Sequence, residues 1–388
     1  MTNRLSPLEI MTRLVSFPTV SHDTNLPLVE WVAEYLSSHG IEHYIWIDPE
    51  QPEKAGLYAH VGPKVDGGVV LSGHTDVVPV EGQDWSSDPY VVVERDGKYF
   101  GRGCADMKGF DALALWALVE GHYADLQRPL QLAYTFDEEI GCTGAPPLIE
   151  EMQKHLPKAE SVIVGEPSML KAVTGHKGAF AMATHVRGYE VHSSLMHQGV
   201  SAVMEAARII DWANHRNTEN RAKPQTEVAA MFTPPWTTVH VGKVSGGTAH
   251  NITAGDCHFW MDFRVVPGES FDDWQAAYEQ EIARVEAEMQ AVNPEAGISI
   301  DKAFSVPGLV PETDGAAETL VRALTGDNAR HVVSYGTEAG HYQVAGYSAV
   351  VCGPGDIAQA HQADEFITVA QFEAGTQFMR DLIKRLAA

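Results

Sequence analysis

The sequence predicts an α/β protein: a mainly parallel sheet with helices on both faces, and a smaller βαββαβ domain inserted into it. Apolar β-branched runs alternate with segments of helical apolar spacing, which predicts the parallel sheet. Acidic or histidine residues follow the ends of those runs, which places polar side chains at one edge of the sheet. The order of elements changes at about Gly178 and changes back after residue 303, which predicts the insertion. We therefore expect a main domain of residues 1–177 and 304–388 and an inserted domain of residues 178–303.

The elements of the main domain are predicted from the period of their apolar residues. In chain order we expect two helices within residues 4–40, a strand at 68–72, a helix at 107–123, a strand at 130–136, a helix at 146–155, a strand at 161–164, a helix at 315–324, a strand at 348–352 and a helix at 371–388. Strands that alternate with helices are joined by crossovers, so the strands are expected to run parallel.

The inserted segment has a different order of elements. We expect a strand at 179–186, a helix at 201–215, strands at 237–244 and 258–265, a helix at 271–291 and a strand at 298–303. This order is the ferredoxin-like split βαβ arrangement. Residues 214–226 and the Pro-Pro-Trp sequence at 234–236 are expected to be loops.

The bulk composition excludes several classes of partner. A formal net charge of −25 at pH 7 argues against nucleic acid and against anionic membrane surfaces, since both require clustered Lys and Arg. Residues 1–20 show no signal peptide, and no apolar run is long enough to span a bilayer, so we expect a cytoplasmic protein. The four cysteines are far apart, which favours reduced thiols. Better-placed carboxylates surround Cys104 and Cys142, so neither cysteine is expected to be a metal ligand.

A set of polar residues follows the predicted strands or lies in the loops after them. Its members are His74, Asp76, Asp106, Glu138, Glu139, Glu166 and His361. Ligands of an α/β sheet gather at the carboxyl ends of its strands, so we expect these side chains to converge. Imidazole and carboxylate donors suit zinc or a similar divalent ion, and an aspartate that can bridge suits two ions. The set therefore predicts a two-metal hydrolase.

Each of these residues, taken alone, has a structural alternative. His74 could be a core histidine held by the carboxylate of Asp76, and His361 could be an ordinary loop histidine. Asp106 and Glu166 could each be the N-cap of a helix. Their common position after strands favours the metal site over these alternatives.

Glu138 and Glu139 are adjacent, so on a regular strand their side chains would face opposite ways. They must therefore leave the strand, and Gly141 assists the turn. Beside a metal, one carboxylate can be a ligand while the other accepts a proton from water. A metal-free glycan or ester hydrolase that used both is disfavoured, since neighbouring residues rarely face each other across a substrate.

These motifs resemble the acetylornithine deacetylase and succinyl-diaminopimelate desuccinylase family, which includes aminoacylases and carboxypeptidases with a di-zinc exopeptidase fold. The resemblance extends from residues 16–21 to the closing helix. It implies two divalent ions, Zn²⁺ or Co²⁺, held by His74, Asp106 (bridging), Glu139, Glu166 and His361. It further implies that Glu138 is the general acid/base and that the peptide bond between Asp106 and Met107 is cis. The His-x-Asp spacing itself predicts that the Asp76 carboxylate accepts the other ring N–H of His74 and orients the ring.

Residues 335–340 and 352–362 are most similar to the deacetylase branch of the family. The implied reaction removes the acetyl group from Nα-acetyl-L-ornithine, in arginine biosynthesis. Asp356 and Ala363 depart from the residues typical of the family, and both bear on substrate fit rather than on metal binding. Another N-acyl amino acid (succinyl-diaminopimelate, acetylcitrulline) or a dipeptide is the alternative substrate. A family member that binds an amino-acid derivative without hydrolysing it is the alternative class of protein.

The resemblance also implies a homodimer formed through the inserted domain, which acts as a lid. His192 would reach across this dimer to stabilise the oxyanion in the partner's active site. Implied substrate contacts are Lys177, Asn251 and Arg264. Thr337 and Glu338 are further predicted substrate contacts: charge complementarity and its position after Thr337 suggest that Glu338 meets the δ-ammonium group of the substrate. Arg264 could instead form a salt bridge to Asp262 or Glu269, and Lys177 could be a solvated charge at the start of a strand.

Overall fold

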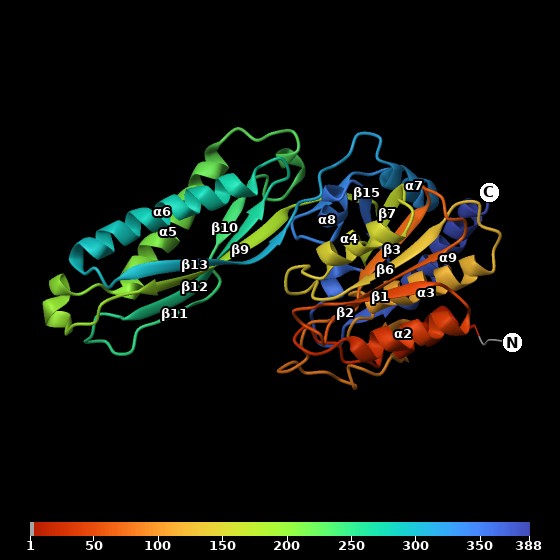
Figure 1. Ribbon diagram of the computed structural model, residues 1–388, viewed down its shortest axis with the longest axis horizontal. Coiled ribbons are helices and arrows are strands. Elements are labelled where there is room, and N and C mark those ends of the chain that lie inside the picture. Colours follow the sequence, from red (N-terminus) through yellow and green to blue (C-terminus); the bar gives the residue numbers. More distant parts are fainter. Residues whose placement is uncertain (1–3) are drawn as a thin grey trace. The chain divides into compact units, whose positions relative to one another are not determined.

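The computed structural model describes residues 4–388. Within them the chain forms two compact units, and each is described by itself (Figure 1). The main unit contains the chain up to Gly175 together with Pro311–His331 and Thr337–Ala388. The lid unit contains His176–Val310 and Val332–Gly336.

An eight-stranded sheet in the order β1-β2-β6-β3-β7-β15-β8-β14 organises the described part of the main unit, and the last residues of β8 and β14 belong to segments assigned to the lid unit. The strands are β1 (His43–Ile47), β2 (Ala55–Val61), β3 (Val69–His74), β6 (Leu130–Thr135), β7 (Ser161–Pro167), β8 (Val173–His176), β14 (His331–Val333) and β15 (Ser348–Gly353). The central strands β6, β3, β7 and β15 are parallel, whereas β1, β2 and β8 pair antiparallel with their neighbours. The sheet is therefore mixed, and the predicted parallel order holds for its centre.

Several strands of the main unit were not predicted. β1 and β2 form a hairpin-like pair at one end of the sheet, and β4 (Val93–Arg95), β5 (Lys98–Phe100) and β16 (Phe366–Thr368) form a separate small sheet. The strands of the small sheet have three residues each, too few to show a period of two.

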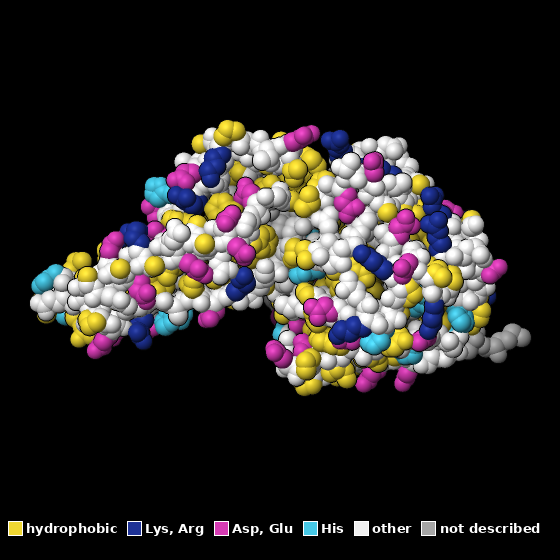
Figure 2. Space-filling model, turned by 45° about the horizontal axis from the view of Figure 1, so that its top comes forward, with side chains coloured by type: hydrophobic (Ala, Val, Ile, Leu, Met, Phe, Trp, Pro, Cys, Tyr) yellow, Lys and Arg dark blue, Asp and Glu magenta, His cyan; other side chains and the backbone are white. Residues whose placement is uncertain are grey.

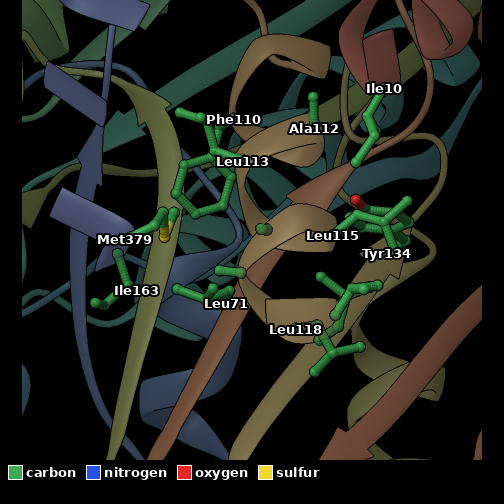
Figure 3. Close-up of a cluster of buried hydrophobic side chains, with 14 of the residues drawn as sticks. Ile10, Leu71, Phe110, Ala112, Leu113, Leu115, Leu118, Tyr134, Ile163 and Met379 are labelled. Atoms are coloured by element: carbon green, nitrogen blue, oxygen red, sulfur yellow. The ribbon is translucent and has the colours of Figure 1, made fainter. Parts of the chain in front are cut away.

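Helices cover both faces of the main sheet. They are α1 (Pro7–Val15), α2 (Leu26–Ser38), α3 (Lys108–His122), α4 (Ala145–His155), α7 (Ala316–Thr325), α8 (Ala339–Val344) and α9 (Val369–Leu386). On one face α3 packs against α1 and α9, and on the other α4 packs against β2, where Leu148 lies over Gly56. Figure 3 shows Phe110 and Leu113 of α3 beside Leu71 of β3 and Met379 of α9. This packing fixes the start of α3, next to the end of β3.

The lid unit has the order β9 (Gly178–Arg187), α5 (Ala202–Ala222), β10 (Thr238–His240), β11 (Val244–Gly246), β12 (Asp256–Val265), α6 (Phe271–Val292) and β13 (Gly297–Val306). Its strands pair antiparallel in the order β10-β12-β9-β13, with β11 also paired to β12. This is the split βαβ topology. The apolar residues of one sheet face form a core with α5 and α6.

Two details of the lid differ from the sequence-based expectation. The strand expected at 237–244 is two short strands, β10 and β11. The loop expected at 214–226 is mostly helix, because α5 continues to Ala222. Its polar residues have a structural use: Asn217 Nδ2 donates to the Val239 carbonyl over 2.6 Å, and Asn220 Nδ2 donates to the Thr237 carbonyl over 2.8 Å.

Acidic, basic and apolar side chains are interspersed over the molecular face shown in Figure 2. None of the helices in residues 4–388 combines the length and the apolar character that a membrane crossing requires.

Candidate metal centre

The predicted ligands of the main unit lie at the carboxyl ends of its central strands. His74 is the last residue of β3, Glu166 lies near the end of β7, and Glu139 follows β6. Asp106 lies just before α3, and His361 lies in the loop after β15. Because β6, β3, β7 and β15 are parallel neighbours, their ends meet at one edge and bring together the four ligands that follow or end these strands. Asp106 joins them from the loop before α3.

Asp106 lies between the two histidines. Its Oδ1 is 3.1 Å from His74 Nε2, and its Oδ2 is 3.2 Å from His361 Nε2. Glu166 Oε1 is 3.7 Å from His74 Nε2, and Glu139 Oε2 is 2.9 Å from His361 Nε2. The site therefore contains two groups of donors, and each group has an imidazole, a glutamate and one oxygen of the shared aspartate.

Negative charge predominates in this buried site. Burial and the neighbouring Asp106 raise the pKa of Glu139 to about 7, and burial also raises the pKa of Glu166 well above its ordinary value. Burial opposes ionisation of Asp106 as well, but hydrogen bonds to His361 and His74 hold its pKa below the ordinary value. Hydrogen bonds to Asp106 and Glu139 raise the pKa of His361 to about 10.

The donor set fits divalent cations. Among the described residues, Glu139 Oε1 is a buried carboxylate oxygen without a hydrogen-bond partner. A buried anionic oxygen is costly unless a cation or a donor satisfies it. One donor atom each from His74, Asp106 and Glu139 lies within 4.8 Å of the others, and the same holds for His74, Glu138 and Glu166. Nitrogen and oxygen donors of this kind suit Zn²⁺ and related ions.

Asp76 connects His74 to the Glu138-Glu139 pair. The His74 Nδ1–H donates to the backbone carbonyl of Asp76 over 2.9 Å, and the Asp76 carboxylate is 3.5 Å away. That carboxylate accepts from the Ser21 hydroxyl (2.7 Å) and from the backbone N–H groups of Glu138 (3.1 Å) and Glu139 (3.3 Å). Asp76 therefore positions both glutamates as well as the histidine, a role that sequence reasoning missed.

The chain turns sharply after β6, as Glu138 and Glu139 require. Asp137 has a φ of 56°, and the Glu138 carbonyl accepts from the N–H groups of Gly141 and Cys142 over 3.0 Å each. The Cys142 thiol donates to Glu138 Oε1 over 3.3 Å, so Cys142 supports the site as a hydrogen-bond donor. Burial raises the pKa of Glu138 well above its ordinary value, and the charge of Glu139 adds to this increase. A carboxyl group with a raised pKa can hold a proton near neutral pH.

A buried ion pair that was not predicted supports the loop of Asp106. Glu365 Oε1 accepts from the backbone N–H groups of Ala105 (2.9 Å) and Asp106 (3.1 Å), while Arg102 Nη1 donates to Glu365 Oε2 over 2.6 Å. Both charged side chains are only 1% exposed. The available signal was an arginine between two glycines near Asp106 and a glutamate four residues after His361. The peptide bond between Asp106 and Met107 is cis, as expected.

The predicted substrate contacts Thr337 and Glu338 are both buried. The Glu338 carboxylate accepts hydrogen bonds from the hydroxyl groups of Thr135 and Ser72, the latter over 3.3 Å. Burial raises the pKa of Glu338 to about 7. Through these hydroxyl donors Glu338 links β3 to β6. Its contact with a substrate ammonium group stays a prediction.

His192 and Asn251 lie in adjacent loops of the lid unit. His192 is exposed, and its ring Nδ1 lies 2.8 Å from the Ser194 hydroxyl. The Ser193 N–H donates to the Asn251 carbonyl over 2.8 Å, which joins the two loops.

The other two lid residues already have partners within their unit. Arg264 Nε donates to Asp262 Oδ2 over 3.1 Å, the salt bridge considered as its alternative. Lys177 is not a solvated charge: it is buried, its Nζ donates to the Trp236 carbonyl over 2.7 Å, and burial lowers its pKa to about 8.

Comparison with known proteins agrees with this arrangement. Residues 70–385 match the model of peptidase family M20/M25/M40. The chain is 34% identical over 370 residues to an acetylornithine deacetylase of Myxococcus xanthus, covering 92% of each protein. It is 32% identical to an acetylornithine deacetylase of Proteus mirabilis, covering 97% of this chain and 96% of the relative. In fold it is similar to an M20 family metallo-carboxypeptidase of Sulfolobus solfataricus, with a TM-score of 0.78, 16% identity and 99% of each chain covered.

Proposed function

The chain belongs to peptidase family M20/M25/M40 and is a hydrolase, and we propose that it removes the acetyl group from Nα-acetyl-L-ornithine, releasing acetate and L-ornithine. The observation on which this proposal depends is the position of Asp106, whose two oxygens face different imidazoles. That arrangement suits two cations that share one carboxylate. The named activity of the relatives supports the choice of acyl group and amino acid.

We assign the ligands by proximity. His74 and Glu166 would hold one ion, His361 and Glu139 would hold the other, and Asp106 would bridge them. Zn²⁺ is the ion that this donor set suits best, and Co²⁺ is the second candidate. When bound, such ions polarise the acyl carbonyl and make an attacking water more acidic.

Glu138 is the proposed proton carrier. It lies next to the ligand Glu139, and its contact with the Cys142 thiol occupies only Oε1. Its carboxylate would take a proton from the attacking water and deliver it to the leaving α-nitrogen of ornithine. The raised pKa of Glu138 supports this role, because the group must hold a proton between the two steps.

The lid is proposed to complete the site in a homodimer. His192, which is exposed at the start of a 3₁₀ helix (Ser193–Gln198), would donate to the oxyanion in a second copy of the chain. Arg264 would exchange Asp262 for the substrate carboxylate, since a guanidinium group binds either carboxylate in the same way. Asn251 would contact the substrate beside His192. We propose a cytoplasmic location, which the four free, buried cysteines support.

The test is acetate release from Nα-acetyl-L-ornithine by purified protein with Zn²⁺ or Co²⁺ added, and with a chelator as the control. N-succinyl-diaminopimelate, Nα-acetylcitrulline, N-acetylmethionine and a dipeptide would be assayed in parallel. We expect metal-dependent turnover with a clear preference for acetylornithine. If the protein prefers another substrate, the two-metal chemistry stands but the assignment to arginine biosynthesis is wrong. If it turns over none of these substrates, both the chemistry and the assignment are wrong.

A further inference from the structure

The lid sheet has one face that helices do not cover within the described residues. Alternate residues of a strand face opposite sides. On β12, Cys257, Phe259 and Met261 are buried against the α5–α6 core, whereas Asp256, His258 and Trp260 are exposed.

Two histidines and an aspartate meet on this exposed face. His185 of β9 is the direct partner of His258 in the β9–β12 register, and Asp256 lies two residues before His258 on the same side of the strand. The two imidazole rings are stacked, with centroids 4.1 Å apart and planes 9° apart. Asp256 Oδ1 is 2.7 Å from His185 Nε2, and one donor atom from each of the three residues lies within 4.8 Å of the others.

We propose that His185, Asp256 and His258 form a further divalent transition-metal site, whose residues are distinct from those of the metal centre in the main unit. Two imidazoles and a carboxylate are the donors that Zn²⁺ prefers. Ligands of a tetrahedral ion with bonds of about 2.1 Å are roughly 3.4 Å apart, so the donor atoms must move closer and the two stacked rings must turn toward a common point when the ion binds. Three protein donors leave a fourth position for water or an external ligand.

The strands hold these donors in place. Val186, Cys257 and Phe259, which neighbour the three donors in sequence, are fully or almost fully buried on the opposite face, so the backbone cannot rotate without disrupting the lid core. The flanking positions in the sheet are small: Ser299 lies opposite His185, and Ser245 lies opposite His258. The imidazoles therefore have room to turn toward an ion.

Arg187 is the nearby cation that could compete with a metal ion for Asp256, but it is engaged elsewhere. Arg187 is the register partner of Asp256, but its Nε donates to the Glu295 carbonyl over 2.9 Å. Asp256 makes its 2.7 Å contact with His185 rather than with this guanidinium group.

The lid offers a matched control. On α5, His215 Nε2 lies 3.3 Å from Asp211 Oδ2 on the surface, which gives an exposed imidazole–carboxylate pair without the second imidazole. His215→Ala therefore removes an exposed histidine with an acidic partner but leaves the three-donor cluster intact.

The experiment measures Zn²⁺ retained per chain after equilibrium dialysis, for the full chain and for His258→Ala, Asp256→Asn and His215→Ala. We expect His258→Ala to retain one ion fewer than the wild type, Asp256→Asn to weaken that ion's affinity by about tenfold or more, and His215→Ala to change neither. Equal stoichiometry in the wild type and His258→Ala would overturn the proposal. Melting temperatures in chelator should agree among all four proteins, which excludes unfolding as the cause of metal loss.

A second measurement uses Cu²⁺ as a paramagnetic probe of imidazole NMR signals. At substoichiometric Cu²⁺, with the catalytic centre already loaded with Zn²⁺, we expect the ring signals of His185 and His258 to broaden before that of His215. Equal broadening of all three signals would mean non-selective surface binding and would overturn the site.

Discussion

At the residue scale, Glu138 and Glu139 differ in their partners although they are adjacent in sequence. Glu139 Oε2 lies 2.9 Å from His361, a histidine that also faces Asp106, whereas Glu138 Oε1 accepts from the Cys142 thiol. The turn after β6 and the carboxylate of Asp76 produce this difference, because they hold the two backbone N–H groups in fixed positions. The two side chains can therefore have different chemical roles.

Replacement of the proposed proton carrier should separate catalysis from metal binding. We expect Glu138→Gln to lower kcat by about 10²–10⁴-fold, since an amide cannot accept the proton of the attacking water. Its metal content, measured by mass spectrometry, should equal that of the wild type. Glu139→Gln is the matched variant and should lose metal. If Glu138→Gln loses metal and Glu139→Gln retains it, the two roles have been assigned in reverse.

The buried Arg102–Glu365 pair should affect both stability and the metal centre. Glu365→Gln leaves Arg102 without its counter-charge in a dry environment, so we expect unfolding free energy to fall by about 3–5 kcal/mol in urea denaturation. Metal affinity should fall by about tenfold, because Glu365 also holds the backbone N–H of Asp106.

The control for this variant is Glu160→Gln, which removes an exposed partner of Arg128. Its unfolding free energy should change by less than about 0.5 kcal/mol. A Glu365→Gln protein that is less stable but binds metal with wild-type affinity would show that the pair supports the fold alone.

At the element scale, the start of α3 is packed directly against the loop that contains Asp106. The Gly109 N–H donates to the Gly103 carbonyl over 3.2 Å, and a Cβ at Gly109 would overlap the carbonyl oxygen of Cys104. The absence of a side chain at this position therefore allows the helix to begin close to the metal centre.

Gly109→Ala should displace this loop from the helix. We expect a loss of about 1–3 kcal/mol in unfolding free energy, together with weaker Zn²⁺ binding in a titration. Gly242→Ala is the control, because a Cβ there has the His240 ring at 3.5 Å as its nearest neighbour and meets no backbone. Equal effects of the two substitutions would argue against a specific role of the close approach at Gly109.

At the scale of the whole molecule, the main unit should depend on metal more than the lid unit does. The carboxyl groups of Asp106, Glu139 and Glu166 surround the two histidines, and burial raises the pKa of both glutamates, so bound divalent ions would stabilise their ionised forms. We expect chelation to increase amide hydrogen exchange at the ends of β3, β6 and β7. Restoring Zn²⁺ to about a thousand times its dissociation constant should stabilise the fold by about 4 kcal/mol.

The lid unit provides the internal reference for this experiment. In the His258→Ala background, which removes the proposed lid site, exchange in β9 and β12 should not change on chelation. If metal slowed amide hydrogen exchange equally in both units, the prediction that metal mainly stabilises the main unit would be wrong.

The sequence by itself determined the features that depend on neighbouring residues. The periods of apolar residues predicted the central strands, the helices α3 and α9 and the order of the lid elements, because side-chain direction repeats regularly along a strand or helix. The position of His74, Glu139 and Glu166 after strands predicted that they would meet, since parallel strands bring their ends to one edge.

Only the tertiary structure decided the features that depend on residues far apart in the chain. Glu365 pairs with Arg102 across 263 positions, and Glu338 accepts a hydrogen bond from Thr135 across 203 positions. The antiparallel pairing of β2 with β6 likewise results from long-range packing. Such contacts form where the folded chain brings buried polar groups within hydrogen-bonding reach of each other, and no local period of the sequence encodes that distance.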